Sequence, residues 1–171
     1  MTPRGNSDIF YVMRFPLSVL LTCAAVCPAA FGQELITQKV LSLDVALAMA
    51  HGALDQCRND GYRVSVTIVD GAGLVKVQMH DDGAGPHTMD FSRKKAYSAF
   101  TFKRTSGETG KAWAAAPPAP LIADAVGTPG GVPIKAGNDV IGAIGVSGAP
   151  GGEKDEACSN AGIAKVASKL K

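Results

Sequence analysis

The chain has 171 residues, of which 46% are hydrophobic and 19% charged, and its formal net charge is +2. This length corresponds to one domain with its own core, and so high an apolar fraction with so little net charge excludes an intrinsically disordered chain. The small charge also excludes the strongly basic surface that is typical of nucleic-acid-binding proteins.

The N-terminal segment, residues 1–32, has the pattern of a secretory signal peptide. Arg14 precedes an apolar run over 15–26, and small residues follow that run. The run is shorter than the about 20 residues that span a bilayer, so no membrane span is expected in the mature form. Cleavage after Gly32 would release a single domain over 33–171, and cleavage after Ala29 also fits the pattern.

The domain over 33–171 keeps two cysteines, Cys57 and Cys158. The signal pattern predicts a periplasmic or secreted protein, and an exported protein with two thiols favours a disulfide. The two cysteines lie near the end of one predicted helix and the start of another, so antiparallel packing of these helices would bring them together. The alternative is two small buried side chains, because free cysteine packs as an apolar residue.

The first predicted elements are a helix and a β-hairpin. Ser42 is a suitable N-cap for a helix that runs to the turn at 59–61, because apolar residues recur at helical spacing between them. Alternating residues over 64–69 and 74–79 predict two strands, and residues 70–73 have the composition of the hairpin turn that joins them.

The middle of the chain is predicted as a helix followed by irregular segments. The helix starts near His87 or Thr88. Residues 105–110 are polar and are predicted as a loop, and 112–119 as irregular, because its adjacent prolines prevent a long helix. Residues 121–126 are predicted as a short strand or a turn.

The last predicted elements are a second hairpin over 132–146, with its turn at 136–139, and a closing helix over 153–170. Gly142 and Gly145 in the returning strand indicate the close approach of another backbone. Hairpins and helices in this order do not follow a βαβ rhythm, so the sequence predicts an α+β fold with an antiparallel sheet.

Three glycine-containing segments resemble motifs of nucleotide-binding proteins and serine hydrolases, but their residue spacing differs from that of the motifs. Residues 107–111 have two residues between the glycines and Ala112 after the lysine, unlike a P-loop. The glycines over 142–148 stand at relative positions one, four and seven, unlike the dinucleotide fingerprint. Ser147 has no glycine two residues after it, unlike the nucleophile of a serine hydrolase. The histidines and cysteines do not have the spacing of a zinc site. No catalytic residue is therefore assigned.

Histidines that flank a glycine-rich loop are the remaining candidates for chemistry. His80 ends a predicted strand and His87 begins a predicted helix, so we expect both imidazoles to face one mouth, whereas His51 lies within a helix and is assigned no role. Neutral imidazole ligates haem iron, and Arg93 and Lys95 carry charges that pair with haem propionates. The alternative, which the residues alone favour, is a surface loop with ordinary histidines and a solvated basic face.

Short segments in a fixed order resemble the GlcG/HbpS-like haem-binding family, a family of haem-degrading or DUF336-type domains that includes the C-terminal domain of PduO-type proteins. The resemblance extends over about residues 36–170. It implies a profilin-like α+β fold, in which helices flank a five-stranded antiparallel sheet, as well as homo-oligomers and haem binding. The segments that carry it are 66–73, 82–84, 94–96, 130–134, 141–148, 155–156 and 161–162.

The positions that the resemblance marks as cofactor-binding candidates are Lys95, Gly131 and Ser147, although each could equally serve the fold. His80 and His87 do not belong to the family pattern and stand on the loop argument alone, as ligands of haem iron. The sequence therefore predicts an exported haem-binding protein, in haem handling or redox sensing. The alternatives are an oligomeric accessory or small-molecule-binding domain without haem, or a haem-degrading enzyme.

Overall fold

A computed structural model describes residues 35–116 and 122–171, so the predicted signal peptide over 1–32 lies outside the described residues. Residues Thr37–Lys171 form one unit. Its elements, in chain order, are α1 (Leu43–Asn59), β1 (Ser65–Val69), β2 (Val75–His80), α2 (Thr88–Phe102), α3 (Ser106–Ala115), β3 (Gly131–Ala136), β4 (Asp139–Ser147), α4 (Gly152–Lys165) and a 3-10 helix (Ala167–Lys169).

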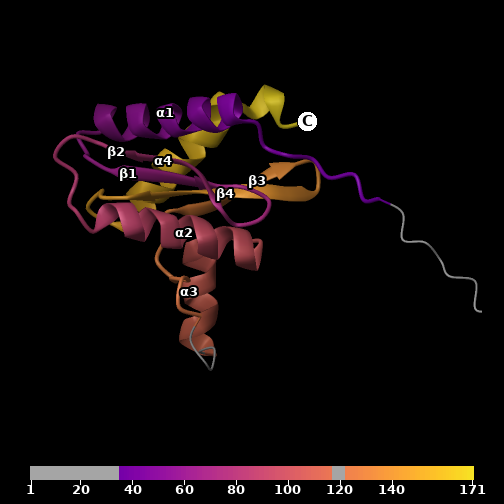
Figure 1. Cartoon of the computed structure of the whole chain (residues 1–171). Coiled ribbons are helices and arrows are strands. Elements are labelled where there is room, and N and C mark those ends of the chain that lie inside the picture. The colour runs from indigo at the N-terminus through magenta and orange to yellow at the C-terminus, as the bar shows by residue number, and fades with distance from the viewer. Residues whose placement is uncertain (1–34, 117–121) are drawn as a thin grey trace, which may run out of the picture. The chain divides into compact units, whose positions relative to one another are not determined.

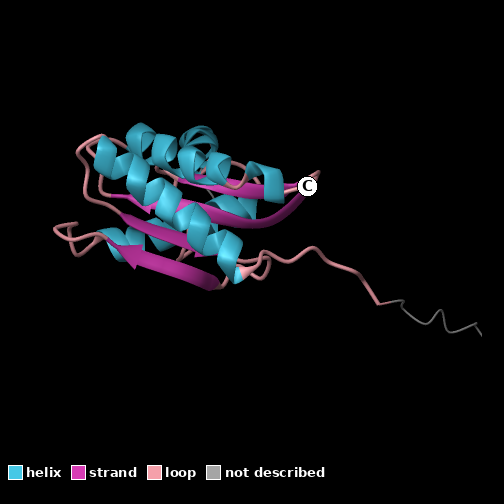
Figure 2. Cartoon of the chain, turned by 90° about the horizontal axis from the view of Figure 1, so that it is seen from above, coloured by secondary structure: helices cyan, strands magenta, loops and turns pink. Residues whose placement is uncertain are grey.

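The strands form an antiparallel sheet in the order β2-β1-β4-β3, so the fold is α+β as the sequence predicts. Helices α1 and α4 cover one face of the sheet, and α2 covers the other (Figure 1). Figure 2 views the same layers from above, with helices lying over the strands. The predicted hairpins and the helices at both ends of the domain are confirmed.

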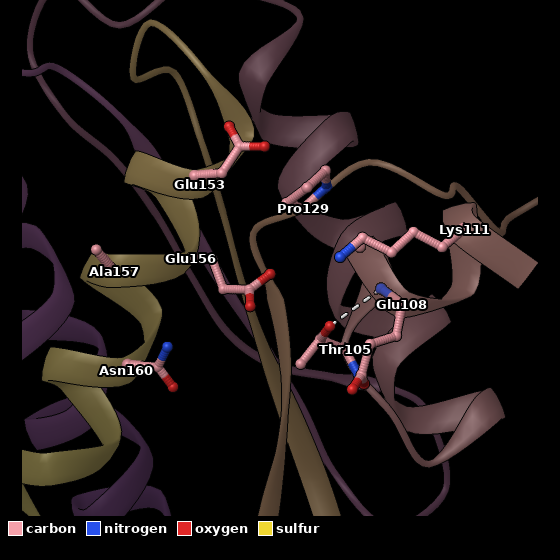
Figure 3. Close-up of a pocket in the computed structure, with 9 residues that line it drawn as sticks. Thr105, Glu108, Lys111, Pro129, Glu153, Glu156, Ala157 and Asn160 are labelled. Atoms are coloured by element: carbon pink, nitrogen blue, oxygen red, sulfur yellow. Dashed lines mark hydrogen bonds between the residues drawn. The ribbon is translucent and has the colours of Figure 1, made fainter.

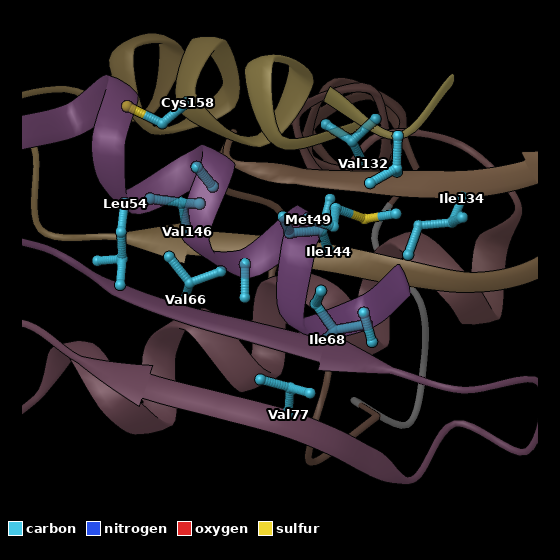
Figure 4. Packing of buried hydrophobic residues seen from close by; sticks show 14 of the residues in the cluster. Met49, Leu54, Val66, Ile68, Val77, Val132, Ile134, Ile144, Val146 and Cys158 are labelled. Carbon is cyan, nitrogen blue, oxygen red and sulfur yellow. The ribbon is translucent and has the colours of Figure 1, made fainter. Parts of the chain in front are cut away.

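Apolar side chains fill the layer between α1, α4 and the sheet (Figure 4). Helix α1 begins where predicted, because the Ser42 hydroxyl accepts a hydrogen bond from the Val45 amide. The predicted disulfide between Cys57 and Cys158 is confirmed: it links α1 to α4 within this layer, with 5.6 Å between the two Cα atoms.

The opposite face of β1 is buried but polar. The Ser65 hydroxyl lies 2.7 Å from that of Thr88, and the Thr67 hydroxyl lies 2.8 Å from that of Ser92. Helix α2 therefore packs on the sheet through paired hydroxyl groups as well as through apolar contacts.

Gly145 in β4 lies directly beneath α2. A Cβ atom at this position would overlap the Ser92 carbonyl oxygen and the Ala96 amide nitrogen. The predicted close backbone approach is thus confirmed, and it brings α2 down onto the sheet.

Helix α3 is a correction to the prediction of a loop over 105–110 and an irregular segment over 112–119. Thr105 and Glu108 form a capping box, in which each side chain accepts a hydrogen bond from the other residue's amide. Gly107 lies against Pro129, which anchors this short helix to the segment before β3. Residues 117–119 lie outside the described residues.

The closing helix is shorter than predicted. Helix α4 ends at Lys165, and the chain continues as the 3-10 helix Ala167–Lys169. The buried side chain of Val166 lies at this change of geometry and joins the core.

The sheet has four strands among the described residues, not the five that the resemblance implies. Residues 122–130 run as turns and extended loop, where the Ala125 amide donates to the Ile122 carbonyl and the Val126 amide donates to the Ser98 hydroxyl. These amides therefore do not join a strand ladder. The profilin-like arrangement stays a prediction.

None of the helices within the described ranges is long and apolar enough to cross a membrane.

Candidate functional site

A cavity of about 330 Å³ lies between α2 and the start of α4. The first turns of α2 form one wall, and the loop from β4 to α4 forms the other. The lining residues are Gly85, His87, Thr88, Phe91, Lys95, Thr128, Ser147, Gly148, Ala149, Gly152 and Asp155. The cavity therefore brings together three sequence-predicted candidates, His87, Lys95 and Ser147.

Lys95 and Asp155 form a buried ion pair in this cavity, with 2.7 Å between Nζ and Oδ2. The other carboxylate oxygen of Asp155 accepts a hydrogen bond of 2.9 Å from the Ala149 amide. Burial raises the pKa of Asp155, and the Lys95 ammonium opposes this shift. The alternative interpretation, in which Lys95 lies on a solvated basic face, is wrong. Lys95 follows Thr88 by seven residues and Ser92 by three, so it shares their buried face.

His87 is exposed at the mouth of the cavity. It is the N-cap residue of α2, and its ring lies close to Gly85. Its side chain makes no hydrogen bond with the described residues, so the ring nitrogens are free to bind a ligand.

His80 does not line the cavity, so the structure does not bring both histidines to one mouth. It is exposed at the end of β2, and its Nδ1 atom lies 2.8 Å from the Ser65 hydroxyl. Ser65 in turn contacts Thr88, which lines the cavity. A chain of two hydrogen bonds therefore connects His80 to the cavity wall.

Arg93 and Gly131 lie outside the cavity. The Arg93 guanidinium binds the carboxylates of Asp90 at 3.0 Å and Asp124 at 2.7 Å, on the outer side of α2. Gly131 is buried in β3, where its amide donates a 2.8 Å hydrogen bond to the Ser106 hydroxyl. A Cβ atom at Gly131 would overlap the Lys95 carbonyl, so this glycine serves the packing of β3 against α2.

A second cavity, of about 470 Å³, lies between α3 and α4 (Figure 3). Its charged lining residues are Glu108, Lys111, Glu153 and Glu156. Burial raises the pKa of Glu156, and the Gly130 amide approaches its carboxylate at 3.4 Å. Within the described ranges, no group of three His, Cys, Asp or Glu side chains could hold a metal ion by themselves.

Asp155 and Phe91 line the cavity although neither is a predicted site residue. Asp155 lies in one of the segments that carry the family resemblance, and its partner Lys95 lies 60 residues earlier in the chain. Phe91 lies one turn before Lys95, and its ring centroid is 5.4 Å from the Lys95 ammonium. Helical spacing from Lys95 was the one signal that pointed to Phe91.

Comparison with known proteins gives a family and several similar folds. The family model described as haem-degrading protein HbpS-like matches residues 41–164. A crystal structure of an HbpS double mutant from Streptomyces reticuli is 37% identical, covers 82% of this chain and 97% of that chain, and has a TM-score of 0.74. No curated protein sequence matches this one.

Two further solved structures share the fold. PduOC in complex with haem is 25% identical, covers 73% of this chain and 94% of that chain, and has a TM-score of 0.69. The Klebsiella pneumoniae protein ORFY is 23% identical, covers 81% of this chain and 99% of that chain, and has a TM-score of 0.75; this likeness shows the fold alone.

Proposed function

The chain belongs to the HbpS-like family, and from this premise we propose that it is an exported haem-binding protein whose haem site is the cavity between α2 and α4. One observation carries the proposal: an exposed histidine with free ring nitrogens, His87, lies at the mouth of that cavity. The haem complex of the similar protein PduOC supports the choice of ligand.

The residues at the cavity fit one end of a haem group. His87 would ligate the iron through a neutral imidazole nitrogen, and the ring of Phe91 would contact the porphyrin. Bound haem would supply a redox-active iron with an exchangeable coordination position. Haem is larger than a cavity of about 330 Å³, so part of the porphyrin would lie outside it.

The predicted partners of the propionates differ in their availability. Lys95 lines the cavity, although Asp155 already neutralises its charge. Arg93 is held by Asp90 and Asp124, so it would have to leave these carboxylates to bind a propionate. Lys95 is therefore the better candidate of the two.

Export and homo-oligomerisation belong to the same proposal. The signal-like pattern over 1–32 supports a periplasmic or secreted location, and the Cys57–Cys158 disulfide is of the kind that persists in an oxidising compartment. Exposed apolar side chains on α1 and the first hairpin support an oligomer, namely Leu43, Leu47, Leu74 and Val75.

The test is a haem titration of the protein without residues 1–32, followed by its absorption spectrum. We expect a saturable Soret shift whose apparent Kd rises at least about tenfold in His87→Ala, because the protein loses the imidazole that would bind the iron. His80→Ala is the matched control, since His80 is also exposed but lies outside the cavity. Binding that is weakened by His80→Ala and not by His87→Ala would reject the proposed ligand, and no saturable shift would reject haem binding.

A second candidate function is haem degradation, which the description of the matching family favours. No pair of residues at the cavity is assigned as general acid and base, so the chemistry would depend on bound haem, with dioxygen as the oxidant of the ring and an external reductant as the source of electrons. Loss of the Soret band with release of ring-cleaved product, on adding reductant to the haem-loaded protein in air, distinguishes an enzyme from a binding protein.

A further inference from the structure

The cavity between α2 and α4 contains hydrogen-bond donors that have no acceptor among the described residues. Ser147 is only 4% exposed and lines the cavity, yet its hydroxyl makes no hydrogen bond with the described residues. An ammonium group has three N–H donors, and among the same residues Lys95 Nζ donates only to Asp155. Among the described residues no fully buried side-chain nitrogen or oxygen lacks a hydrogen-bond partner, so the Ser147 hydroxyl reaches the surface of the cavity, where a ligand can replace water as its partner.

The first turn of α4 adds to this excess. Gly151 is the N-cap residue and has no side chain to cap the helix, whose 14 residues begin at Gly152. The Gly152 amide has no backbone acceptor among the described residues, and Gly152 lines the cavity. Free amides and the helix dipole both favour a negative group at this end of a helix.

Asp155 does not accept hydrogen bonds from all of these donors, because both of its carboxylate oxygens already have partners. One of its oxygens binds the Lys95 ammonium, and the other accepts from the Ala149 amide. Ser147 and the remaining N–H groups of Lys95 are therefore available to an acceptor that enters the cavity, and a ligand with two acceptor oxygens can replace the water there.

We infer that this cavity is a carboxylate-binding site, in which Ser147 and Lys95 hold the two oxygens and the Phe91 ring contacts the apolar body of a small organic acid. A volume of about 330 Å³ suits a small ligand of this kind. The neighbouring cavity is unsuited to it, because Glu108, Glu153 and Glu156 would repel an anion. The carboxylate could belong to a free organic acid or to a propionate of haem.

The first experiment is calorimetric titration of the protein with benzoate, and with benzamide as a neutral ligand of similar shape. We expect saturable benzoate binding, at least about tenfold weaker binding of benzamide, and about tenfold weaker benzoate binding in Ser147→Ala, because a hydrogen bond to a charged group is lost. Asn160→Ala, which alters the neighbouring cavity, should bind benzoate as the unchanged protein does.

Three outcomes would overturn the inference: no saturable benzoate binding, equal binding in Ser147→Ala, or benzamide that binds as well as benzoate. Inorganic phosphate that binds more tightly than benzoate, and loses affinity in Ser147→Ala, would replace a carboxylate site with a phosphate site. Lys95→Met is not a suitable variant, since it leaves the buried Asp155 without its partner.

Haem and its dimethyl ester distinguish the two sources of the carboxylate. If benzoate competes with haem, and the ester binds more weakly than haem, the site takes a propionate. If haem and its ester bind alike and benzoate competes with neither, the site takes a free organic acid. Benzoate binding that depends on Ser147, in a protein that shows no Soret shift, would reject the proposed haem function and leave the carboxylate site supported.

Discussion

At the scale of single residues, the burial of Lys95 depends on one partner. The side chains of Lys95 and Asp155 are both buried, and each supplies the charge that the other needs in a medium of low polarity. The Ala149 amide fixes the orientation of the carboxylate. The position of the ammonium in the cavity therefore depends on the loop that precedes α4.

Replacing Lys95 with methionine removes one charge and leaves the other buried. We expect the free energy of unfolding to fall by about 3–5 kcal/mol, as is typical when one partner of a buried ion pair is lost. Urea denaturation followed by circular dichroism measures this change.

Lys94→Met is the matched control, because Lys94 pairs at 2.8 Å with the exposed carboxylate of Asp90. Loss of an exposed pair costs about 0–1 kcal/mol. Equal destabilisation by the two substitutions would show that the Lys95–Asp155 pair has no special role in the fold.

At the scale of elements, α3 shows how a short helix forms from residues of low helix propensity. Its first half contains Gly107 and Gly110, yet Thr105 and Glu108 satisfy the amides at its start. Gly107 lies against Pro129 and Gly110 against Gly127, so the segment before β3 holds the helix in place. The cap and this packing together stabilise a helix that would be marginal alone.

Thr105→Ala tests the contribution of the cap. We expect a loss of about 1 kcal/mol in the free energy of unfolding, because the Glu108 amide loses its acceptor. Thr101→Ala, at an exposed position within α2, should change the same quantity by less than about 0.5 kcal/mol. Equal stability of Thr105→Ala and the unchanged protein in urea denaturation would show that packing alone maintains α3.

The elements that were predicted well are those with strong local signals. The N-cap Ser42, the glycine turn of the first hairpin and the alternation over 64–69 all act between near neighbours in the chain. The start of α3 had such a signal too, since Thr105 and Glu108 have the spacing of a capping box. Gly107, Gly110 and the prolines at 117–118 disfavour a helix, so the segment was predicted as a loop despite this signal.

The candidate site was predicted less completely than the fold. His87, Lys95 and Ser147 meet at one cavity, but nothing local distinguishes them from Arg93 or Gly131, which do not. The difference arises from contacts between distant segments, such as α2 against the start of α4. Such contacts are set by tertiary packing and leave no periodic pattern in the sequence.

At the scale of the whole molecule, the disulfide joins the first helix of the domain to the last. Cys57 and Cys158 are separated by 101 residues and are fully buried in the layer that α1 and α4 form with the sheet. A cross-link over so long a loop restricts the unfolded chain strongly, which is the main source of its stabilising effect in the chain-entropy account.

Replacing both cysteines with alanine should lower the free energy of unfolding by about 2–5 kcal/mol. Urea denaturation measures this loss, and the same experiment on the reduced protein should give a similar value. Thiol counting on denatured protein without residues 1–32 provides the covalent control, with free thiols found only after reduction. Equal thiol counts before and after reduction would show that the bond is absent.

The disulfide can form only in a chain that has been synthesised as far as α4. Cys158 lies in α4, the last α-helix of the fold, so the bond cannot close until synthesis has passed nearly all of the sheet and its covering helices. A chain interrupted before that point retains Cys57 as a free thiol, whatever else it has folded. The oxidation state of the Cys57 sulfur thus distinguishes complete domains from C-terminally truncated chains. A cellular system that recognises exposed thiols could use this difference.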